Sequence, residues 1–177
     1  MSDMDVTSFR FITLRRQAFR IFCILAFTSP AHAGEVALQI NGLSYHPHTS
    51  VKYNDKNDGL GLQYSKFASD GGSYQFLAAG WLKNSVGHPL PYAGAGLAKR
   101  FGGEHLYTDL SLFIFGGSYH GYQRTIHFIA PLPVLSIGSG PVAVNFMYVP
   151  KIADVRDPAY FVQLKIILGN LGQRTAW

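Results

Sequence analysis

Apolar and polar side chains alternate in short runs along the chain after residue 33. The run 159–168 shows the pattern most clearly, with Tyr160, Val162, Leu164, Ile166 and Leu168 on one face and Phe161, Gln163 and Lys165 on the other. A period of two residues is typical of a β-strand with one apolar face, whereas a helix repeats apolar residues at three and four. The same period recurs in 58–67 and 105–118. We therefore predict a chain built mainly of strands.

Turn residues divide the chain into eight runs of this kind. The predicted strands are 36–45, 58–67, 73–84, 90–101, 105–118, 126–137, 141–149 and 159–168. Most have about ten residues, the length with which a tilted strand crosses a bilayer. An open sheet in lipid would leave its edge amides unpaired, so the strands are expected to close. The predicted fold is all-β, an eight-stranded antiparallel transmembrane β-barrel.

The most apolar stretch, residues 127–150, contains four prolines and the sequence Gly138-Ser139-Gly140. Interior proline breaks a helical hydrogen-bond ladder, so this stretch is predicted as strand, turn and strand. The other connections after even-numbered strands, Asp70-Gly71-Gly72 and Gly102-Gly103-Glu104, are also short and glycine-rich. Those after odd-numbered strands are longer and richer in charge and histidine. This asymmetry is the outer-membrane pattern of periplasmic turns and external loops.

The first 33 residues have the composition of a secretory signal peptide. They contain, in order, Arg10, Arg15, Arg16, Arg20, the apolar run 21–27 and Ala31-His32-Ala33. Clustered arginines before an apolar block, followed by small residues, predict cleavage after Ala33. An amphipathic helix would spread its arginines along one face, and Arg15-Arg16 leaves export of the folded chain as an alternative. We expect a signal peptide over 1–33 and one barrel domain over 34–177.

Removing the signal peptide changes the charge and the available chemistry. The whole chain has 15 basic and 10 acidic residues, and removal leaves eleven and eight, a net charge of +3. The remaining basic residues form no stripe with interleaved aromatics, so a nucleic-acid partner is not expected. Cys23, the single cysteine, lies inside the signal. Without a thiol, a phosphate loop or a metal-ligand cluster, no cofactor and no metal site is expected.

Three blocks of the sequence stand out: PLPVL at 131–135 with GPVAVNFMYVP at 140–150, Tyr53-Asn54 with Gly59-Leu60-Gly61-Leu62, and KNSVGHPLPYAGAGL at 83–97. In their order along the chain they resemble the lipid A palmitoyltransferases, a family of eight-stranded outer-membrane enzymes. The resemblance implies transfer of an acyl chain from a phospholipid to lipid A in the outer leaflet. It further implies an integral outer-membrane protein, expected as a monomer. The aromatic terminus at Trp177 is similar to the signal read by the outer-membrane assembly machinery.

The resemblance also implies a site near the outer surface, where the family needs a histidine, an aspartate and a serine. His46 matches the histidine, Ser85 matches the serine, and Asn84 stands at the aspartate position. His46 would remove the proton of an acceptor hydroxyl, and Ser85 or backbone amides would hold the oxyanion. Because Asn84 carries no charge, either the mechanism would be weakened or a different carboxylate would support the imidazolium. The candidates are Asp55, Asp58 and Asp109.

Two features of the chain bear on this site. His46 shares the parity of Val36, Leu38 and Ile40, so it reaches the lumen only through a bulge or at a strand end. The alternative to a catalytic site is that His46, His48 and His88 are solvated loop histidines. The family's helix before the barrel has no counterpart here. The family has prolines that interrupt the hydrogen-bond ladder between strands and so admit a lipid from the side. Pro150 matches one of them, but Asn41 and Asn57 stand at two others, so no unpaired backbone is expected near the rim.

The remaining polar and aromatic residues predict structural roles. The expected polar plug of the lumen comprises Gln63, Ser65, Asp109, Ser111, Asn145, Gln163 and Lys165, with Asp109 and Lys165 paired. The tyrosines expected at the membrane interfaces are Tyr92, Tyr107, Tyr119, Tyr122, Tyr148 and Tyr160. Two functions follow: a lipid-acting enzyme, an acyltransferase or alternatively an esterase or deacylase, and a non-catalytic barrel with a structural, adhesive or apolar-ligand role. An upper lumen sealed by side chains would favour the second.

Overall fold

The computed structural model describes residues 34–47, 49–103, 105–121, 125–150 and 157–171. The predicted signal peptide, Cys23, His48, Tyr122 and Trp177 lie outside these ranges. No helix in the described part of the chain is long and apolar enough to cross a bilayer.

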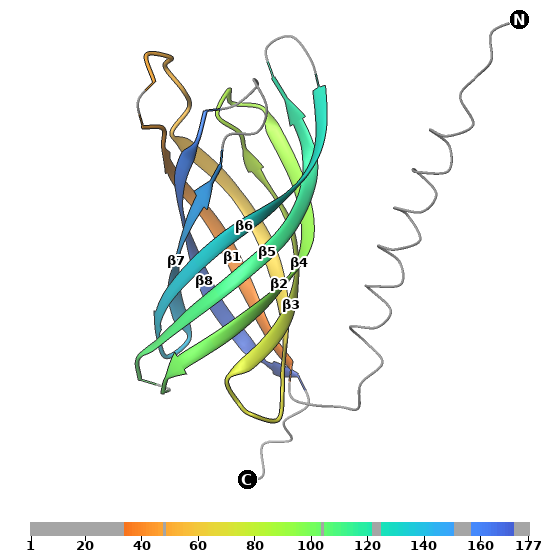
Figure 1. Cartoon of the computed structure of the whole chain (residues 1–177), viewed down its shortest axis with the longest axis vertical. Coiled ribbons are helices and arrows are strands. Elements are labelled where there is room, and N and C mark those ends of the chain that lie inside the picture. The colour runs from red at the N-terminus through yellow and green to blue at the C-terminus, as the bar shows by residue number, and fades with distance from the viewer. Residues whose placement is uncertain (1–33, 48, 104, 122–124, 151–156, 172–177) are drawn as a thin grey trace, which may run out of the picture. The chain divides into compact units, whose positions relative to one another are not determined.

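Eight antiparallel strands close into one barrel, in which each strand pairs with its neighbours in sequence and β1 pairs with β8 (Figure 1). The strands are β1 (Gly34–Tyr45), β2 (Lys56–Phe67), β3 (Ser73–Lys83), β4 (Pro89–Gly102), β5 (Tyr107–His120), β6 (Thr125–Ser139), β7 (Val142–Val149) and β8 (Ala159–Leu171). The predicted fold class is confirmed, and every predicted strand overlaps its observed counterpart. The prediction from a period of two residues was correct because each strand has one face in the lumen.

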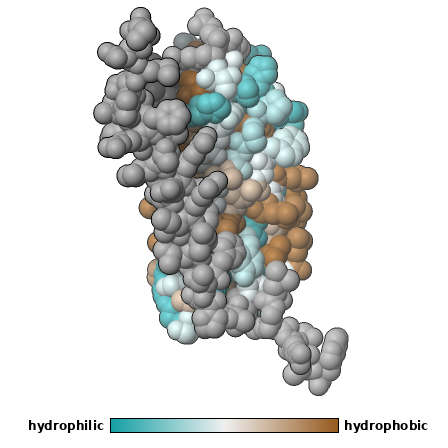
Figure 2. Space-filling view, turned by 90° about the vertical axis from the view of Figure 1, so that its right-hand side faces the viewer, coloured by the Kyte–Doolittle hydropathy of each residue, from teal (hydrophilic) through white to brown (hydrophobic). Residues whose placement is uncertain are grey.

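The exterior of the barrel carries the apolar faces of the strands. In β8, Phe161, Gln163 and Lys165 are buried, whereas Tyr160 and Val162 are exposed, as the sequence predicted. The large exposed apolar side chains on strands include Leu60, Leu62, Leu97, Leu110, Leu112, Ile114, Ile129, Leu135, Ile137, Phe146 and Leu168. On the face shown in Figure 2, apolar residues gather at mid-height below a more hydrophilic region. Soluble proteins rarely expose apolar surface on this scale, so the exterior favours lipid as its surroundings.

The two ends of the barrel differ in their connections. The connections β2–β3, β4–β5 and β6–β7 lie together at one end, here called the turn end, opposite the loop end (Figure 1). The β6–β7 turn consists only of Gly140 and Pro141. It is shorter than the predicted turn Gly138-Ser139-Gly140, because β6 extends through Gly138 to Ser139. Gly140 has φ +53°, a left-handed conformation that favours glycine in a two-residue hairpin turn.

A β-bulge in β1 turns His46 toward the lumen. Between the pairs Asn41↔Gln163 and Ser44↔Phe161, β1 has two intervening residues and β8 has one. The extra residue reverses the alternation, so Asn41 and Ser44 are both buried and Tyr45 is exposed. His46 is consequently buried, with 7% of its surface exposed. The predicted requirement for a bulge is confirmed, and the interpretation of His46 as a solvated loop residue is wrong.

The ladder between β6 and β7 is incomplete near the loop end. It runs from Ser139↔Val142 to Val134↔Met147 and stops there, although β6 continues to Thr125 and β7 to Val149. Pro131 and Pro133 lie in the part of β6 that pairs with β5 but not with β7, and proline has no N–H to donate. In Figure 1 this part of β6 runs beside β5 and away from β7. The expectation that no unpaired backbone lies near the rim is therefore wrong for the β7 side of β6, where the ladder stops next to Pro133.

The ladder between β2 and β3 also stops early, at Gly61↔Gly80, but side chains continue the connection. Asn41 Nδ2 donates to the carbonyl oxygen of Trp81 at 3.0 Å. Asn57 Nδ2 donates to that of Lys83 at 2.8 Å. A Cβ on Gly59 would collide with the Trp81 carbonyl, so the strands remain in close contact. These asparagines stand where the family resemblance places prolines, and here they hold the wall together.

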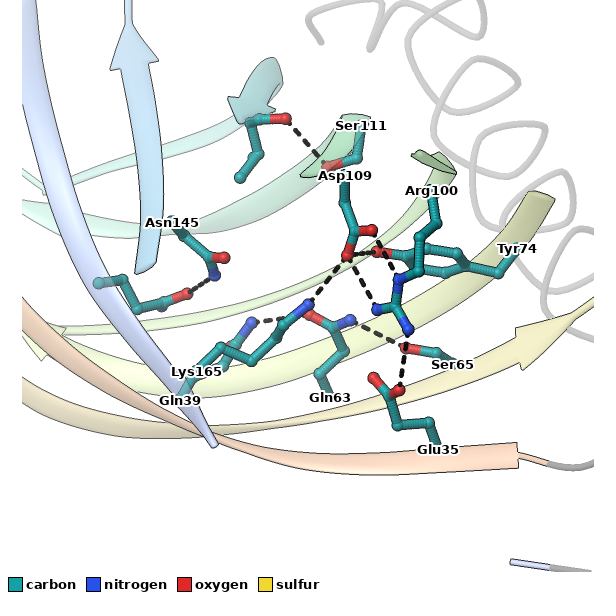
Figure 3. Close-up of polar contacts among 12 residues, drawn as sticks. Glu35, Gln39, Gln63, Ser65, Tyr74, Arg100, Asp109, Ser111, Asn145 and Lys165 are labelled. Atoms are coloured by element: carbon teal, nitrogen blue, oxygen red, sulfur yellow. Dashed lines mark hydrogen bonds and ion pairs between the residues drawn. The ribbon is translucent and has the colours of Figure 1, made fainter. Parts of the chain in front are cut away.

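A charged cluster fills the lumen toward the turn end (Figure 3). Arg100 donates twice to Asp109, at 2.8 and 3.0 Å, and Tyr74 donates to the same carboxylate at 2.7 Å. Lys165 Nζ lies 3.3 Å from Asp109 Oδ2, which confirms the predicted pair. Arg100 lies 3.6 Å from Glu35. Two cations and two carboxylates thus balance one another in the described lumen, as buried charges require.

The tyrosines divide between the two faces of the barrel. Tyr148 and Tyr160 are exposed on the exterior, with ring centroids 5.4 Å apart, as expected for interfacial residues. Tyr92, Tyr107 and Tyr119 are buried, so the interfacial prediction is wrong for them. Their strands direct them inward, where Tyr92 donates to Gln39 Oε1 at 3.1 Å.

Candidate functional site

The structure brings His46 and Ser85 together at the loop end of the barrel. His46 follows β1 and Ser85 follows β3, and Nε2 of His46 lies 2.9 Å from Oγ of Ser85. Both residues are buried, and only 1% of Ser85 is exposed. A serine hydroxyl at hydrogen-bond distance from an imidazole nitrogen is the pairing that general-base chemistry requires. Two residues that the sequence separates by 39 positions therefore form one unit.

Asn54 ties together the two loops that carry this pair. Its backbone N–H donates to the carbonyl oxygen of Ser85 at 2.7 Å, and its side-chain Nδ2 donates to that of Asn84 at 3.1 Å. The carbonyl of Asp55 in turn accepts from the N–H of Ser44 in β1 at 2.9 Å. The loop after β1 is thus fastened both to its own strand and to the loop after β3. These bonds restrict the relative movement of His46 and Ser85.

Asn84 organises the turn that presents Ser85. Its Oδ1 accepts from the N–H groups of Val86 and His88, both at 3.0 Å, and its Nδ2 donates to the carbonyl oxygen of His120 at 2.9 Å. The residue is 2% exposed. A carboxylate here would have no N–H to give to His120, so an amide fits this position better than an aspartate. Asn84 therefore contributes to the site by shaping the turn that carries Ser85, because its side-chain atoms bond to backbone groups.

Among the three candidate carboxylates, only Asp55 faces the imidazole. Its Oδ1 lies 3.6 Å from Nδ1 of His46, on the side opposite Ser85. Asp58 instead accepts from Lys83 at 2.9 Å on the exterior, and Asp109 belongs to the cluster toward the turn end. The Asp55 side chain is 65% exposed, so water screens its interaction with the ring. Serine, histidine and aspartate nevertheless stand in the order of a catalytic triad.

Tyr53 packs against the imidazole. Its ring centroid lies 4.3 Å from that of His46, with the planes tilted by 34°. The hydroxyl donates to Asp157 Oδ2 at 3.0 Å, which connects the loop after β1 to the chain before β8. Burial, followed by this hydrogen bond, raises the pKa of Tyr53, so the phenol stays protonated and keeps donating. Tyr53 therefore fixes the plane of the ring that faces Ser85.

A cavity of about 80 Å³ lies in the lumen between this site and the charged cluster. That volume holds roughly five to eight waters or part of a slender apolar chain. Its aromatic and aliphatic walls include Phe76, Leu82, Leu90, Phe113, Phe115, Leu132, Met147, Val149 and Phe161. Asn84, the residue before Ser85, also lines it. Side chains therefore do not fill the lumen throughout, and part of the wall of the space that they leave is apolar.

Amide side chains form the floor of the cavity. Gln39, Gln63 and Gln163 line it together with Asn145 and Lys165. Gln39 donates to Gln63 at 3.0 Å, and Asn145 donates to Gln163 at 2.8 Å. Figure 3 shows Gln39, Gln63 and Asn145 near the charged cluster, and Lys165 belongs to both sets through its contact with Asp109. An apolar chain entering from the loop end would stop at this network, because passing it would break hydrogen bonds in a low dielectric.

Comparisons with known proteins leave the chain without an assigned family. No family model matches the sequence, and no curated protein is similar to it. Among solved structures, Ail, the attachment invasion locus protein of Yersinia pestis, has 10% sequence identity and a TM-score of 0.44. The match covers 76% of this chain and 97% of that chain. The barrel described above rests on the strands and ladders of this chain itself.

Proposed function

We propose that this protein is an outer-membrane barrel that transfers an acyl chain from a phospholipid to an acceptor hydroxyl, with lipid A as the acceptor. The observation that carries the proposal is the 2.9 Å contact between His46 and Ser85, together with a lumen cavity that Asn84, the residue before Ser85, helps to line. The imidazole is the base that removes a hydroxyl proton. The apolar walls suit the acyl chain of the donor. The sequence resemblance to lipid A palmitoyltransferases supports the choice of acceptor.

Three features support a membrane setting for this reaction. The exterior is apolar around the strands, the strands close into a barrel, and the two longest connections, β1–β2 and β7–β8, both lie at the loop end. These are the properties of outer-membrane barrels with their loops outside. In that orientation His46 lies near the outer leaflet, where lipid A and misplaced phospholipid meet.

The incomplete ladder between β6 and β7 supplies a route for the donor. The part of β6 that does not pair with β7 begins beyond Val134 and includes Pro131 and Pro133. Leu132 and Val149, one on each strand beyond the last β6–β7 pair, also line the cavity. An acyl chain in the outer leaflet can pass between strands there without breaking ladder hydrogen bonds. The route joins the lipid phase to the apolar walls below the site.

The proposal is tested by expressing the whole chain in a Gram-negative strain that lacks its own lipid A palmitoyltransferase and measuring lipid A by mass spectrometry. Transfer predicts a gain of one acyl chain that disappears in His46→Ala and remains in His88→Ala, an exposed histidine of the loop after β3. Heat-modifiable migration on gels shows that each variant forms a barrel. A His46-dependent loss of acyl chain would identify a deacylase. Unchanged lipid A in a folded barrel would leave the non-catalytic function, a structural, adhesive or apolar-ligand role.

A further inference from the structure

We infer that Ser85 is a nucleophile and that the acyl chain passes through a covalent ester on its Oγ, with Asp55 in the place of the triad acid. This inference rests on the proposed function and deepens it by dividing the transfer into two steps. The geometry behind it is the sequence of contacts from Ser85 Oγ to His46 Nε2 at 2.9 Å and from His46 Nδ1 to Asp55 Oδ1 at 3.6 Å.

The hydroxyl that His46 already holds is the hydroxyl of Ser85. In a one-step transfer the imidazole must accept a proton directly from the acceptor lipid, and Ser85 would then compete for the same nitrogen. A base that is hydrogen-bonded to a serine in the resting protein activates that serine first. Burial of Ser85 and the bonds from Asn54 to its loop keep this arrangement in place. The geometry therefore favours a serine nucleophile over a serine oxyanion donor.

The chemistry balances in two halves. In the first, Ser85 Oγ attacks the ester carbonyl of the phospholipid and its proton moves to His46 Nε2. The bond from that carbonyl to the glycerol oxygen breaks, and the oxygen takes the proton from His46 to leave as a lysophospholipid hydroxyl. In the second, the acceptor hydroxyl gives its proton to His46 and attacks the acyl ester. Ser85 Oγ leaves with that proton, which restores the resting pair.

Asp55 acts here as a positioning residue. During each half-reaction the imidazole becomes positively charged, and a carboxylate beside Nδ1 stabilises that charge and orients the ring. Asn84, at the position that the family resemblance assigns to an aspartate, is occupied by the turn around Val86 and His88. Because Asp55 is 65% exposed, its removal is expected to slow the reaction only about twofold to fivefold at low salt. That loss should diminish in high salt, which a purely structural role would not explain.

The test uses a fluorophosphonate with a single alkyl chain, which phosphonylates activated serines. Purified full-length barrel in vesicles is treated with this probe, and the modified residue is mapped by peptide mass spectrometry. The inference predicts stoichiometric labelling of Ser85, abolished by Ser85→Ala and by His46→Ala. Asp55→Asn should slow labelling about twofold to fivefold and shift its pH profile. The matched control is Asp58→Asn, another exposed loop-end aspartate, which should label at the wild-type rate.

The outcomes separate this inference from the proposed function. Acyl transfer by a wild-type barrel whose Ser85 does not label, or transfer that survives in a folded Ser85→Ala variant, overturns the covalent step and leaves a one-step reaction. Labelling of Ser85 without transfer to lipid A supports the nucleophile and contradicts the choice of acceptor. Heat-modifiable migration confirms folding, and Ser85→Cys provides a second variant whose thiol should accept an acyl group from a p-nitrophenyl ester.

Discussion

Replacing Asp109 by alanine should destabilise the barrel more than any change to an exposed carboxylate. The Asp109 side chain is 0% exposed and receives hydrogen bonds from Arg100, Tyr74 and Lys165. Its removal leaves two cations in the lumen facing Glu35, which lies 3.6 Å from Arg100. Removing one partner of a buried ion pair costs about 3–5 kcal/mol, because the remaining charge keeps its desolvation penalty. We expect a decrease of that size in the free energy of unfolding.

The assay is urea unfolding of the barrel in vesicles, followed by heat-modifiable migration, with the urea midpoint compared at constant slope. Asp70→Ala is the matched control, since Asp70 also bonds to a lysine at 2.9 Å and a serine hydroxyl at 2.7 Å, but on an exposed turn. Its effect should be much smaller because water screens both partners. Equal shifts for the two variants would refute the assignment of a buried charge balance to the lumen.

A double-mutant cycle tests the charge balance itself. Asp109→Asn leaves two cations against one carboxylate, and adding Lys165→Met restores one against one. The double variant should therefore lose less stability than the sum of the two single variants, by about 1–3 kcal/mol. Additive losses would mean that the two side chains do not interact.

Two further predictions concern the wall and the turn end. A disulfide between Pro133→Cys and Tyr148→Cys, just beyond the last β6–β7 pair, should lower acyl transfer until a reductant is added, because it closes the proposed route. The matched control joins the paired positions Leu135 and Phe146 and should leave transfer unchanged. At the turn end, hydrogen bonds from Lys99 and then Ser73 lower the pKa of Asp70 below its ordinary 3.8. Its stabilisation is therefore present above that value and lost as the pH falls, so the urea midpoints of wild type and Asp70→Asn should converge from about pH 5 to about pH 2.

The barrel could be predicted from the sequence because every strand repeats the same physical requirement. One face forms the apolar exterior and the other meets the lumen, so the period of two recurs eight times and marks the strands. The predicted partnership of Asp109 and Lys165 followed from the same alternation. Arg100 joins them from β4 and was missed, although its inward parity, alternating with Leu97 and Lys99 on the exterior, is visible in the sequence.

The candidate site was only partly predictable. His46 and Ser85 were found through the family resemblance, and the parity of β1 correctly required a bulge. The role of Asn84 could not be read from its residue type, because it depends on which backbone groups the turn brings within reach. The gap between β6 and β7 was missed because the family resemblance places prolines at Asn41 and Asn57. The prolines next to the end of the β6–β7 ladder lie instead inside β6.

The central claim is tested most directly with purified barrel in vesicles that contain lipid A and a phospholipid with an isotopically labelled acyl chain. Mass spectrometry follows labelled lipid A and lysophospholipid together. The account predicts that both appear in equal amounts and that His46→Ala slows their formation about 10²- to 10⁴-fold while the barrel stays folded. Absence of both products from folded wild-type protein, or equal rates in wild type and His46→Ala, would contradict it.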